Sequence, residues 1–388
     1  MLKLPSSTTP IFRGPRPVSE RPVAPQNSRY LQQEEFERLT KIFGEVIEVD
    51  DKDMTRNWMV RSSKPSIRFY RYEMLHDWKR FFEKEKIRNR CYLIGGATCH
   101  VIDSSYSYSD VDIEFELNED DIKRNPTIFG KIQMEMAVML FRKQDMSSGG
   151  MKEGERTISE SELDYIENSF YGKKIIVCND KTQEPLWSLF NLFRKNGLPT
   201  EIKFTAKKGR SFILMGDSLK IELESFLKNE LSILSTSSSD FALAIKCVQE
   251  RSIYTEDPQN IVGGGFLKAC MMKADGWTDL QDIPAGGKTM SEMRVSMLEN
   301  FLKFNFREPN NFTKMAAIDK FLVSHYEIPD RIGSRAKEQM LVKRRTFLLR
   351  VEKDLHETRI GEGYQQERGR ASARLRDIIS KNEVCETF

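Results

Sequence analysis

Two aspartates two residues apart are the residues of this sequence whose types and spacing best suit chemistry. They are Asp110 and Asp112, in a stretch where acidic and apolar residues alternate up to Leu117. Alternation of this kind predicts a strand, and side chains two apart on a strand point to the same face. Paired carboxylates can share Mg²⁺ ions, which favour oxygen ligands and can clamp the attacking and leaving oxygens of a nucleotidyl transfer.

A glycine turn precedes the two aspartates. Gly95 and Gly96 follow the apolar run Cys91–Ile94, so we expect a strand that ends in a tight turn. Residues without a Cβ let backbone amides approach phosphate oxygens closely. A third carboxylate would complete a metal shell and orient an acceptor hydroxyl, and the best candidate is Glu201 in the apolar-alternating stretch 200–204.

A purely structural interpretation competes with the catalytic one. Asp110, Asp112, Glu114 and Glu116 could simply form the solvated face of a half-buried strand. No lysine stands between them in the sequence, however, and like charges on a shared face repel. This repulsion favours bound cations at the acidic face.

The elements around these residues predict an α+β fold with two main domains. Helical spacing marks two amphipathic helices within 36–46 and 75–82, and strand patterns follow at 173–178, 186–193, 200–205 and 211–222. From about residue 239 helical patterns dominate. We predict the following regions: a disordered Pro-rich leader (1–28), a mixed-sheet domain whose N-terminal helices could pack on the second domain (29–238), a helical domain (239–355) and a charged tail (356–388).

Composition sets the broad class of the protein. The 388 residues carry 61 basic and 58 acidic side chains, so the net charge of +3 gives no global argument for nucleic acid. The six cysteines form no CxxC pair and read as reduced thiols, which suggests an intracellular protein. No apolar run approaches the roughly 20 residues needed to span a bilayer, so we expect no membrane span.

Several separated segments together resemble one family, the terminal nucleotidyltransferase 5 poly(A) polymerases of the DNA polymerase beta-like nucleotidyltransferase superfamily. The segments that carry the resemblance are Leu93-Ile-Gly-Gly-Ala97, Ser109-Asp-Val-Asp-Ile113, Val177-Cys-Asn-Asp180, Glu201-Ile-Lys-Phe204, Gly216-Asp-Ser-Leu219 and the glycine-rich run from Asp257 to Cys270. Their order and rough spacing agree over about residues 30–355. The family commonly has serine as the second residue of the glycine turn, where this sequence has Gly96.

The resemblance implies a nucleotidyltransferase mixed-sheet domain and a helical poly(A)-polymerase core domain, with the active site in the cleft between them. It implies that Asp110, Asp112 and Glu201 are catalytic and hold Mg²⁺ or Mn²⁺. It assigns Gly95, Gly96, Ser109 and Lys268 to ATP, although Lys268 could equally be a solvent-facing residue after a glycine hinge. The expected partners are ATP and an RNA 3′ end, with room for a regulatory protein and no DNA, in a cytoplasmic and also nuclear location.

Three functions remain open at this point. The leading one is template-independent addition of AMP to RNA 3′ ends, with a role in mRNA stability. The second is a catalytically weak relative that serves as an RNA- or protein-binding scaffold. The third keeps the nucleotidyl transfer but directs it to a protein or a small molecule.

Overall fold

The computed structural model describes residues 24–49, 67–147, 161, 171–175, 187–192, 194–196, 198–206, 214–256, 258, 265–306, 317–326 and 334–384. The chain divides into two compact units, one formed by residues 1–209 and 219–236 and the other by 210–218 and 237–388. The described residues 214–218 therefore belong with the helical part, whereas the sequence pattern places them in the sheet domain. The predicted leader is described only from residue 24 onward, and of the segment 159–170, where the apolar spacing predicts a helix, only residue 161 is described.

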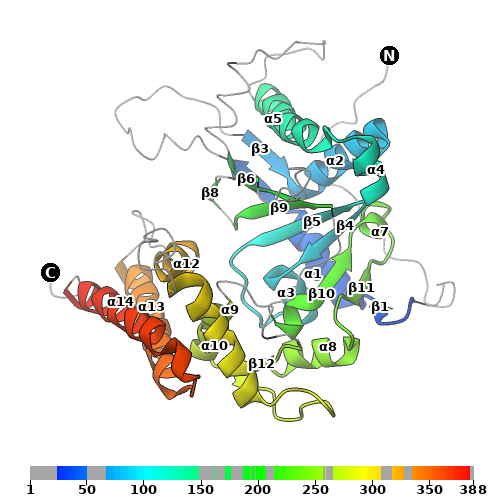
Figure 1. The fold of residues 1–388 in the computed structure, drawn as a ribbon. Coiled ribbons are helices and arrows are strands. Elements are labelled where there is room, and N and C mark those ends of the chain that lie inside the picture. The colour runs from blue at the N-terminus through cyan, green and yellow to red at the C-terminus, as the bar shows by residue number, and fades with distance from the viewer. Residues whose placement is uncertain are drawn as a thin grey trace, which may run out of the picture. The chain divides into compact units, whose positions relative to one another are not determined.

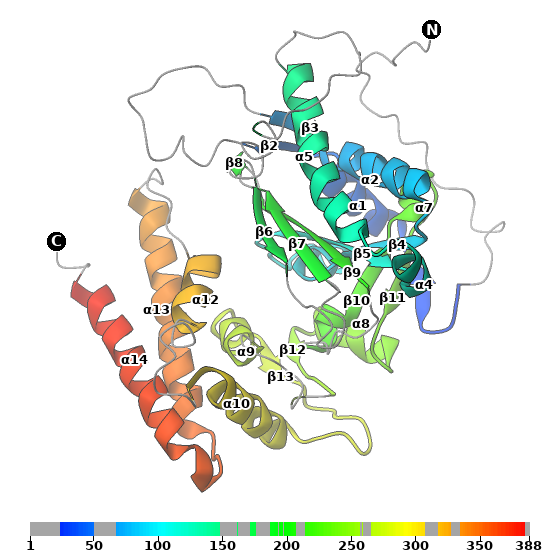
Figure 2. The ribbon, with the colours of Figure 1, turned by 45° about the horizontal axis from the view of Figure 1, so that its top comes forward.

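The first unit is built on an eight-stranded mixed sheet in the order β1-β11-β10-β4-β5-β9-β7-β6 (Figure 1). Only β5 and β9 pair in parallel among its neighbouring strands. The strands are β1 (Ser28–Tyr30), β4 (Asn89–Ile94), β5 (Val111–Leu117), β6 (Tyr171–Ile175), β7 (Trp187–Leu192), β9 (Thr200–Thr205), β10 (Leu219–Glu222) and β11 (Ile233–Thr236). Figure 2 shows β6, β7 and β9 side by side.

Smaller elements surround this sheet. A three-stranded sheet has the order β3-β2-β8. Its strands are β2 (Val46–Val49), β3 (Ile67–Tyr70) and β8 (Arg194–Asn196). The helices of this unit are α1 (Gln33–Phe43), α2 (Arg71–Glu85), α3 (Gly96–Ile102), α4 (Glu119–Arg124), α5 (Ile128–Ser147) and α7 (Glu224–Leu227).

The apolar face of the central strands forms the core of the first unit. Ile113, Phe115, Ile202 and Phe204 are almost fully buried there. Trp78 of α2 packs on Phe204 with the ring centroids 4.6 Å apart. Aromatic side chains bury large areas, so this packing fixes β5 and β9 against the helix and leaves their opposite faces for polar residues.

The N-terminal helices pack on the first unit's own elements. Phe43 of α1 lies 5.2 Å from Phe226 of α7, between ring centroids. Phe82 of α2 lies 5.5 Å from Phe115 of β5. The apolar faces of α1 and α2 are therefore used within the sheet domain, and the packing of these helices on the second domain stays a prediction.

The second unit is mainly helical. It contains the pair β12 (Ser252–Ile253) and β13 (Thr278–Asp279), two short 3-10 turns (Met215–Ser218 and Glu362–Tyr364), and the helices α8 (Phe241–Gln249), α9 (Gly265–Ala274), α10 (Met290–Phe306), α12 (Ala317–Tyr326), α13 (Ser334–Glu357) and α14 (Gln365–Val384). Both ribbon views show α13 and α14 side by side.

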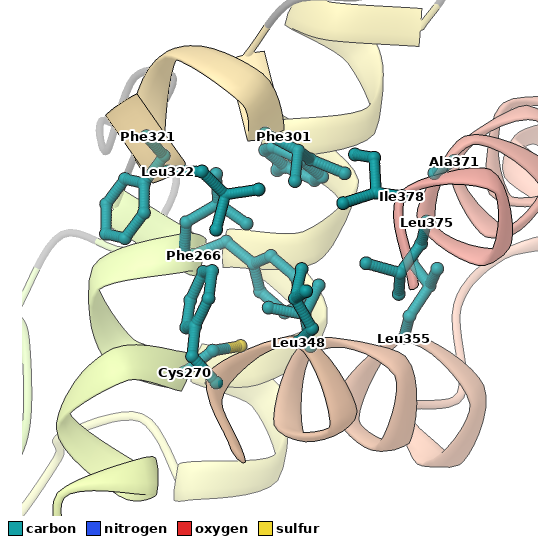
Figure 3. Close-up of a cluster of buried hydrophobic side chains, with 14 of the residues drawn as sticks. Phe266, Cys270, Phe301, Phe321, Leu322, Leu348, Leu355, Ala371, Leu375 and Ile378 are labelled. Carbon is teal, nitrogen blue, oxygen red and sulfur yellow. The ribbon is translucent and has the colours of Figure 1, made fainter. Parts of the chain in front are cut away.

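The charged C-terminal segment 356–388, expected as a mobile tail or a frayed helix, contains a helix packed over Gln365–Val384. Ala371, Leu375 and Ile378 of α14 are buried in the hydrophobic cluster that also holds Phe301 and Leu348 (Figure 3). Their spacing of three and four residues places them on one helix face. This stripe is narrow, so the charged residues on the rest of the helix conceal it in the sequence.

Five charged side chains meet inside the helical unit. The Lys273 Nζ atom lies 3.2 Å from Asp279 Oδ1 and 3.6 Å from Asp354 Oδ2. Arg294 pairs with Asp279, and Arg350 Nη2 lies 2.8 Å from Asp354 Oδ1. Three cations thus share two carboxylates. Burial above all, together with the two arginines, lowers the pKa of Lys273 to about 8, although Asp354 opposes the shift.

Among the described helices none is long and apolar enough to cross a membrane.

Candidate active site

The polar face of β5 carries the acidic residues that the sequence singles out. Ile113 and Phe115 face the core, and Asp112, Glu114 and Glu116 alternate with them on the opposite face. Asp110 lies immediately before the strand, and the backbone amide of Val111 donates to the carbonyl of Pro199 at 2.8 Å. The strand's alternation and its neighbour's loop therefore position the two aspartates.

Parallel pairing with β9 brings a second carboxylate to Asp112. The Cα partner of Asp112 on β9 is Glu201. Directly paired residues of neighbouring strands share a face of the sheet, so both carboxylates project on the same side. Asn191 of β7 pairs with Glu201 in turn, and its Nδ2 donates to Glu201 Oε1 at 3.4 Å.

The glycine turn lies directly against Asp112. Gly95 has φ of 72° and directly follows β4, and α3 begins at Gly96. A Cβ atom on Gly95 would lie 2.7 Å from Asp112 Oδ2, closer than real contacts allow. The backbone conformation therefore favours glycine at position 95, and a larger residue there would displace the Asp112 carboxylate.

Gly96 contacts the link between the turn and the aspartates. A Cβ there would lie 3.1 Å from Tyr108 Cβ and 3.6 Å from Tyr106 Cε1. His100 of α3 has its Nδ1 at 2.8 Å from the Tyr106 carbonyl oxygen, and its ring centroid lies 4.8 Å from that of Tyr108. The two tyrosines thus pack the link onto α3, and His100 serves that packing.

A lysine that sequence reasoning missed neutralises the acidic pair. Lys203 Nζ donates to Asp112 Oδ1 at 2.5 Å and lies 3.4 Å from Glu201 Oε2. The only signal in the sequence is its position two residues after Glu201, which puts both side chains on one face of β9. The expected repulsion along β5 is therefore relieved partly by the protein's own cation.

A second lysine neutralises an acidic residue, Glu116, near the other end of β5. Lys220 of β10 donates from Nζ to Glu116 Oε1 at 2.9 Å and lies 4.1 Å from the centroid of the Tyr92 ring. Both lysines are separated in sequence from the acidic residues of β5 and reach them only across strands. An acidic run without interleaved lysine is thus a weak indicator of bound metal.

The electrostatics of the pair favour a cation between the two carboxylates. Burial is the main cause that raises the pKa of Glu201, the Asp112 charge adds to it, and Lys203 opposes it. The side chains of Asp112 and Glu201 are 15% and 23% exposed, so ions from solvent can reach them. An arrangement in which burial and mutual repulsion both disfavour ionisation is stabilised by positive charge.

The fit to a divalent metal rests on this pair. Asp112 and Glu201 already direct oxygens at one cation, the Lys203 ammonium, which marks the position where hard oxygen ligands converge. Within the described part of the chain, no group of three or more His, Cys, Asp or Glu residues could hold a metal ion. The geometry supports Asp112 and Glu201 as ligands, and Asp110 as a third ligand stays a prediction.

Two further residues, Ser109 and Lys268, are predicted to bind the nucleotide. Ser109 is exposed in the link just before Asp110. Lys268 is on α9 of the helical unit, where its Nζ donates to Asp217 Oδ2 at 2.5 Å. A role of either residue in nucleotide binding stays a prediction.

Arg71 is a second residue that sequence reasoning missed. Its side chain is 2% exposed, and its Nε donates to Thr200 Oγ1 at 3.0 Å while Nη2 donates to the Leu198 carbonyl at 3.1 Å. Nη1 donates to the carbonyl of Ile42 and to Glu45, each at 2.8 Å. Arg71 thereby holds the start of β9, one residue before Glu201.

Comparisons with known proteins place the chain among nucleotidyltransferases. Terminal nucleotidyltransferase 5B of Rattus norvegicus is 26% identical over 249 residues, which cover 60% of this chain and 53% of that protein. Terminal nucleotidyltransferase 5C of Homo sapiens is 28% identical over 181 residues, 43% of each chain. The chain thus spans about half the length of these curated relatives.

A solved structure of the CCA-adding enzyme of Thermotoga maritima with tRNA aligns at 15% identity and a TM-score of 0.31, covering 87% of this chain and 73% of that one. A TM-score this low supports no conclusion about this chain. The family described as Nucleotidyltransferase, by contrast, matches residues 31–385, which include the glycine turn, both aspartates and Glu201. On that match the chain belongs to the nucleotidyltransferase family and resembles its terminal nucleotidyltransferase 5 members.

Proposed function

We propose that this protein is a template-independent nucleotidyltransferase that adds AMP from ATP to the 3′ end of RNA. The observation that carries the proposal is the direct strand pairing of Asp112 with Glu201, with the Asp112 carboxylate against the Gly95 turn. Nucleotidyl transfer needs positioning and charge neutralisation more than a covalent nucleophile. The names of the related terminal nucleotidyltransferases support the reaction class.

Each part of the site has a role in this proposal. Asp112 and Glu201, with Asp110 as a third ligand, would hold magnesium or manganese, which when bound supplies charge neutralisation at the reacting oxygens. The backbone amides of the Gly95-Gly96 turn would bind the triphosphate beside the carboxylates. Ser109 and Lys268 are proposed as further nucleotide contacts on the strength of the resemblance alone.

The choice of ATP and RNA is tested by varying both substrates. Purified protein is incubated with Mg²⁺, a labelled oligo(A) primer and one nucleoside triphosphate at a time, beside the double variant Asp110→Ala/Asp112→Ala. We expect extension with ATP by the wild type alone, and its loss when EDTA removes divalent ions. Extension with another nucleotide would correct the base preference, and labelling of protein in the absence of primer would move the acceptor to a protein.

One observation favours the second candidate, a binding protein without turnover. The Lys203 ammonium already lies against both carboxylates. If this lysine never gives way to a metal, the same polar face would serve only to bind RNA or a protein partner. Failure of the wild type to extend any primer, together with RNA binding that survives EDTA, would support that candidate.

The cellular role follows from the resemblance and is proposed with it. We infer mRNA 3′ ends as the target, a stabilising effect on those messages, a regulatory protein partner, and a cytoplasmic and nuclear location. Sequencing of poly(A) tails in cells with and without the Asp112→Ala variant tests the target class. Unchanged tail lengths would contradict it.

A further inference from the structure

The Lys203 ammonium lies against the two carboxylates that the proposed metal would bind. The ammonium is 2.5 Å from Asp112 Oδ1 and 3.4 Å from Glu201 Oε2, and the residue is only 8% exposed. An ammonium so close to both carboxylates occupies the oxygens that a divalent ion would need. Two cations cannot share these positions without strong repulsion.

Lys203 has a third carboxylate within reach. Its Cα partner on β5 is Glu114, which is also only 8% exposed. Side chains directly opposite each other on paired strands have Cβ atoms about 5 Å apart. A long, flexible lysine side chain can therefore move its charge from Asp112 towards Glu114 without leaving the sheet face.

From these contacts we propose that Lys203 is a built-in counter-ion of the carboxylate pair, which keeps Asp112 and Glu201 together in the metal-free protein and must withdraw towards Glu114 when a divalent ion binds. Lys203 is a positioning residue in this account, because it acts through the two carboxylates. The inference rests on the proposed function, which supplies the divalent ion. Lys203 therefore lowers the affinity of the carboxylate pair for a divalent ion.

The expected size of the effect follows from Coulomb's law. Even if solvent screened the charges as fully as bulk water, a unit charge about 5 Å from a divalent ion would weaken its binding about tenfold. Burial of Lys203 reduces the screening and increases the effect. Lys203→Met should therefore tighten metal binding by about tenfold or more.

The test measures Mn²⁺ affinity of the whole protein without nucleotide, by the electron paramagnetic resonance signal of free Mn²⁺. Lys203→Met removes the charge, Lys203→Arg keeps it, and Lys220→Met is the matched control, since it removes the equivalent lysine from Glu116. We expect tighter binding by about tenfold with Lys203→Met, and wild-type affinity within about threefold for the other two. Equal or weaker binding by Lys203→Met than by the wild type would overturn the inference.

Two additional arms separate this inference from the proposed function. Asp112→Asn should abolish the Mn²⁺ site in both the wild-type and the Lys203→Met backgrounds. Mn²⁺ binding that depends on Asp112 but is unchanged by Lys203→Met would refute the counter-ion role and leave the nucleotidyltransferase proposal intact. Absence of Asp112-dependent binding in every variant would refute both.

Stability gives a readout that does not depend on affinity. Without metal, Lys203→Met leaves Asp112 and Glu201 facing each other unneutralised, so its melting temperature in EDTA should fall below that of Lys220→Met. Saturating Mn²⁺ should raise the melting temperature of Lys203→Met more than that of the wild type. Equal rises in the two proteins would contradict the proposal.

Discussion

Replacement of Gly95 by alanine tests the geometry of the turn with a single methyl group. The new Cβ would lie 2.7 Å from Asp112 Oδ2, which is about 0.7 Å short of the 3.4 Å at which ordinary contact begins. Asp112 or the turn must therefore shift by a comparable amount. The backbone at Gly95, with φ of 72° and ψ of −150°, is also one that alanine rarely adopts.

The two effects have separable magnitudes. Displacement of a reactive group by about 1 Å can cost roughly 100-fold in rate, so we expect Gly95→Ala to lower ATP incorporation by about that factor. The strained backbone should lower the free energy of unfolding by about 1–3 kcal/mol. Primer extension under single-turnover conditions measures the first effect, and urea unfolding measures the second.

Gly130→Ala is the matched control, because a Cβ at Gly130 in α5 meets nothing within 4 Å. Alanine is favoured over glycine inside a helix by about 0.5–1 kcal/mol, so this variant should keep full activity and gain slightly in stability. If Gly95→Ala retained activity within threefold of the wild type while remaining folded, the proposed contact between the turn and Asp112 would be wrong.

Three further predictions concern parts of the structure that support the site or the helical unit. Arg71→Ala should lower the free energy of unfolding by about 3–5 kcal/mol, because it leaves a buried set of hydrogen-bond acceptors such as Thr200 without their donor; a loss below 1 kcal/mol in urea would contradict the anchoring role. Between pH 8 and 10.5 the Lys273 side chain is protonated in the unfolded chain and deprotonated in the folded protein, so the free energy of unfolding should rise with pH over this window. Lys273→Met should remove this rise, and identical pH profiles of the two proteins would count against the lowered pKa. Leu375→Ala should destabilise the protein by about 2–5 kcal/mol and the exposed Arg376→Ala by less than about 0.5 kcal/mol, and equal values would mean that α14 does not pack as described.

Local patterns predict the elements of this protein well. The alternation of residues 110–117 predicts β5, and the glycines predict the turn into α3. The apolar spacing around Trp78 predicts α2, and the helical pattern over 335–355 predicts α13, which spans Ser334–Glu357. In each case the signal lies within a few turns or strand repeats of one segment, where periodicity is informative.

Such local patterns do not predict which side chains meet across neighbouring strands. The neutralisation of Asp112 by Lys203 depends on the register of β5 against β9, which is set by the whole sheet. Arg71 reads as one more charged residue at a helix start, although its side chain is 2% exposed. Long-range pairing fixes both roles, and no local spacing encodes it.

Helix α14 was hidden for a different reason. Its charged residues dominate the composition, and only the stripe of Ala371, Leu375 and Ile378 reaches the core. A mobile tail and a helix with a narrow buried stripe look alike in composition. A search for apolar residues at spacings of three and four within the charged segment could have separated them.

The most direct test of the central claim compares three acidic residues on one sheet face. Asp112→Asn and Glu201→Gln remove the paired carboxylates, and Glu116→Gln removes a carboxylate of the same face that pairs with Lys220 instead. Single-turnover transfer of AMP from ATP to an RNA primer should fall by at least about 1,000-fold in each of the first two variants and by less than about threefold in the third. Comparable losses in all three, or none in Asp112→Asn, would contradict the assignment of Asp112 and Glu201 as the catalytic carboxylates.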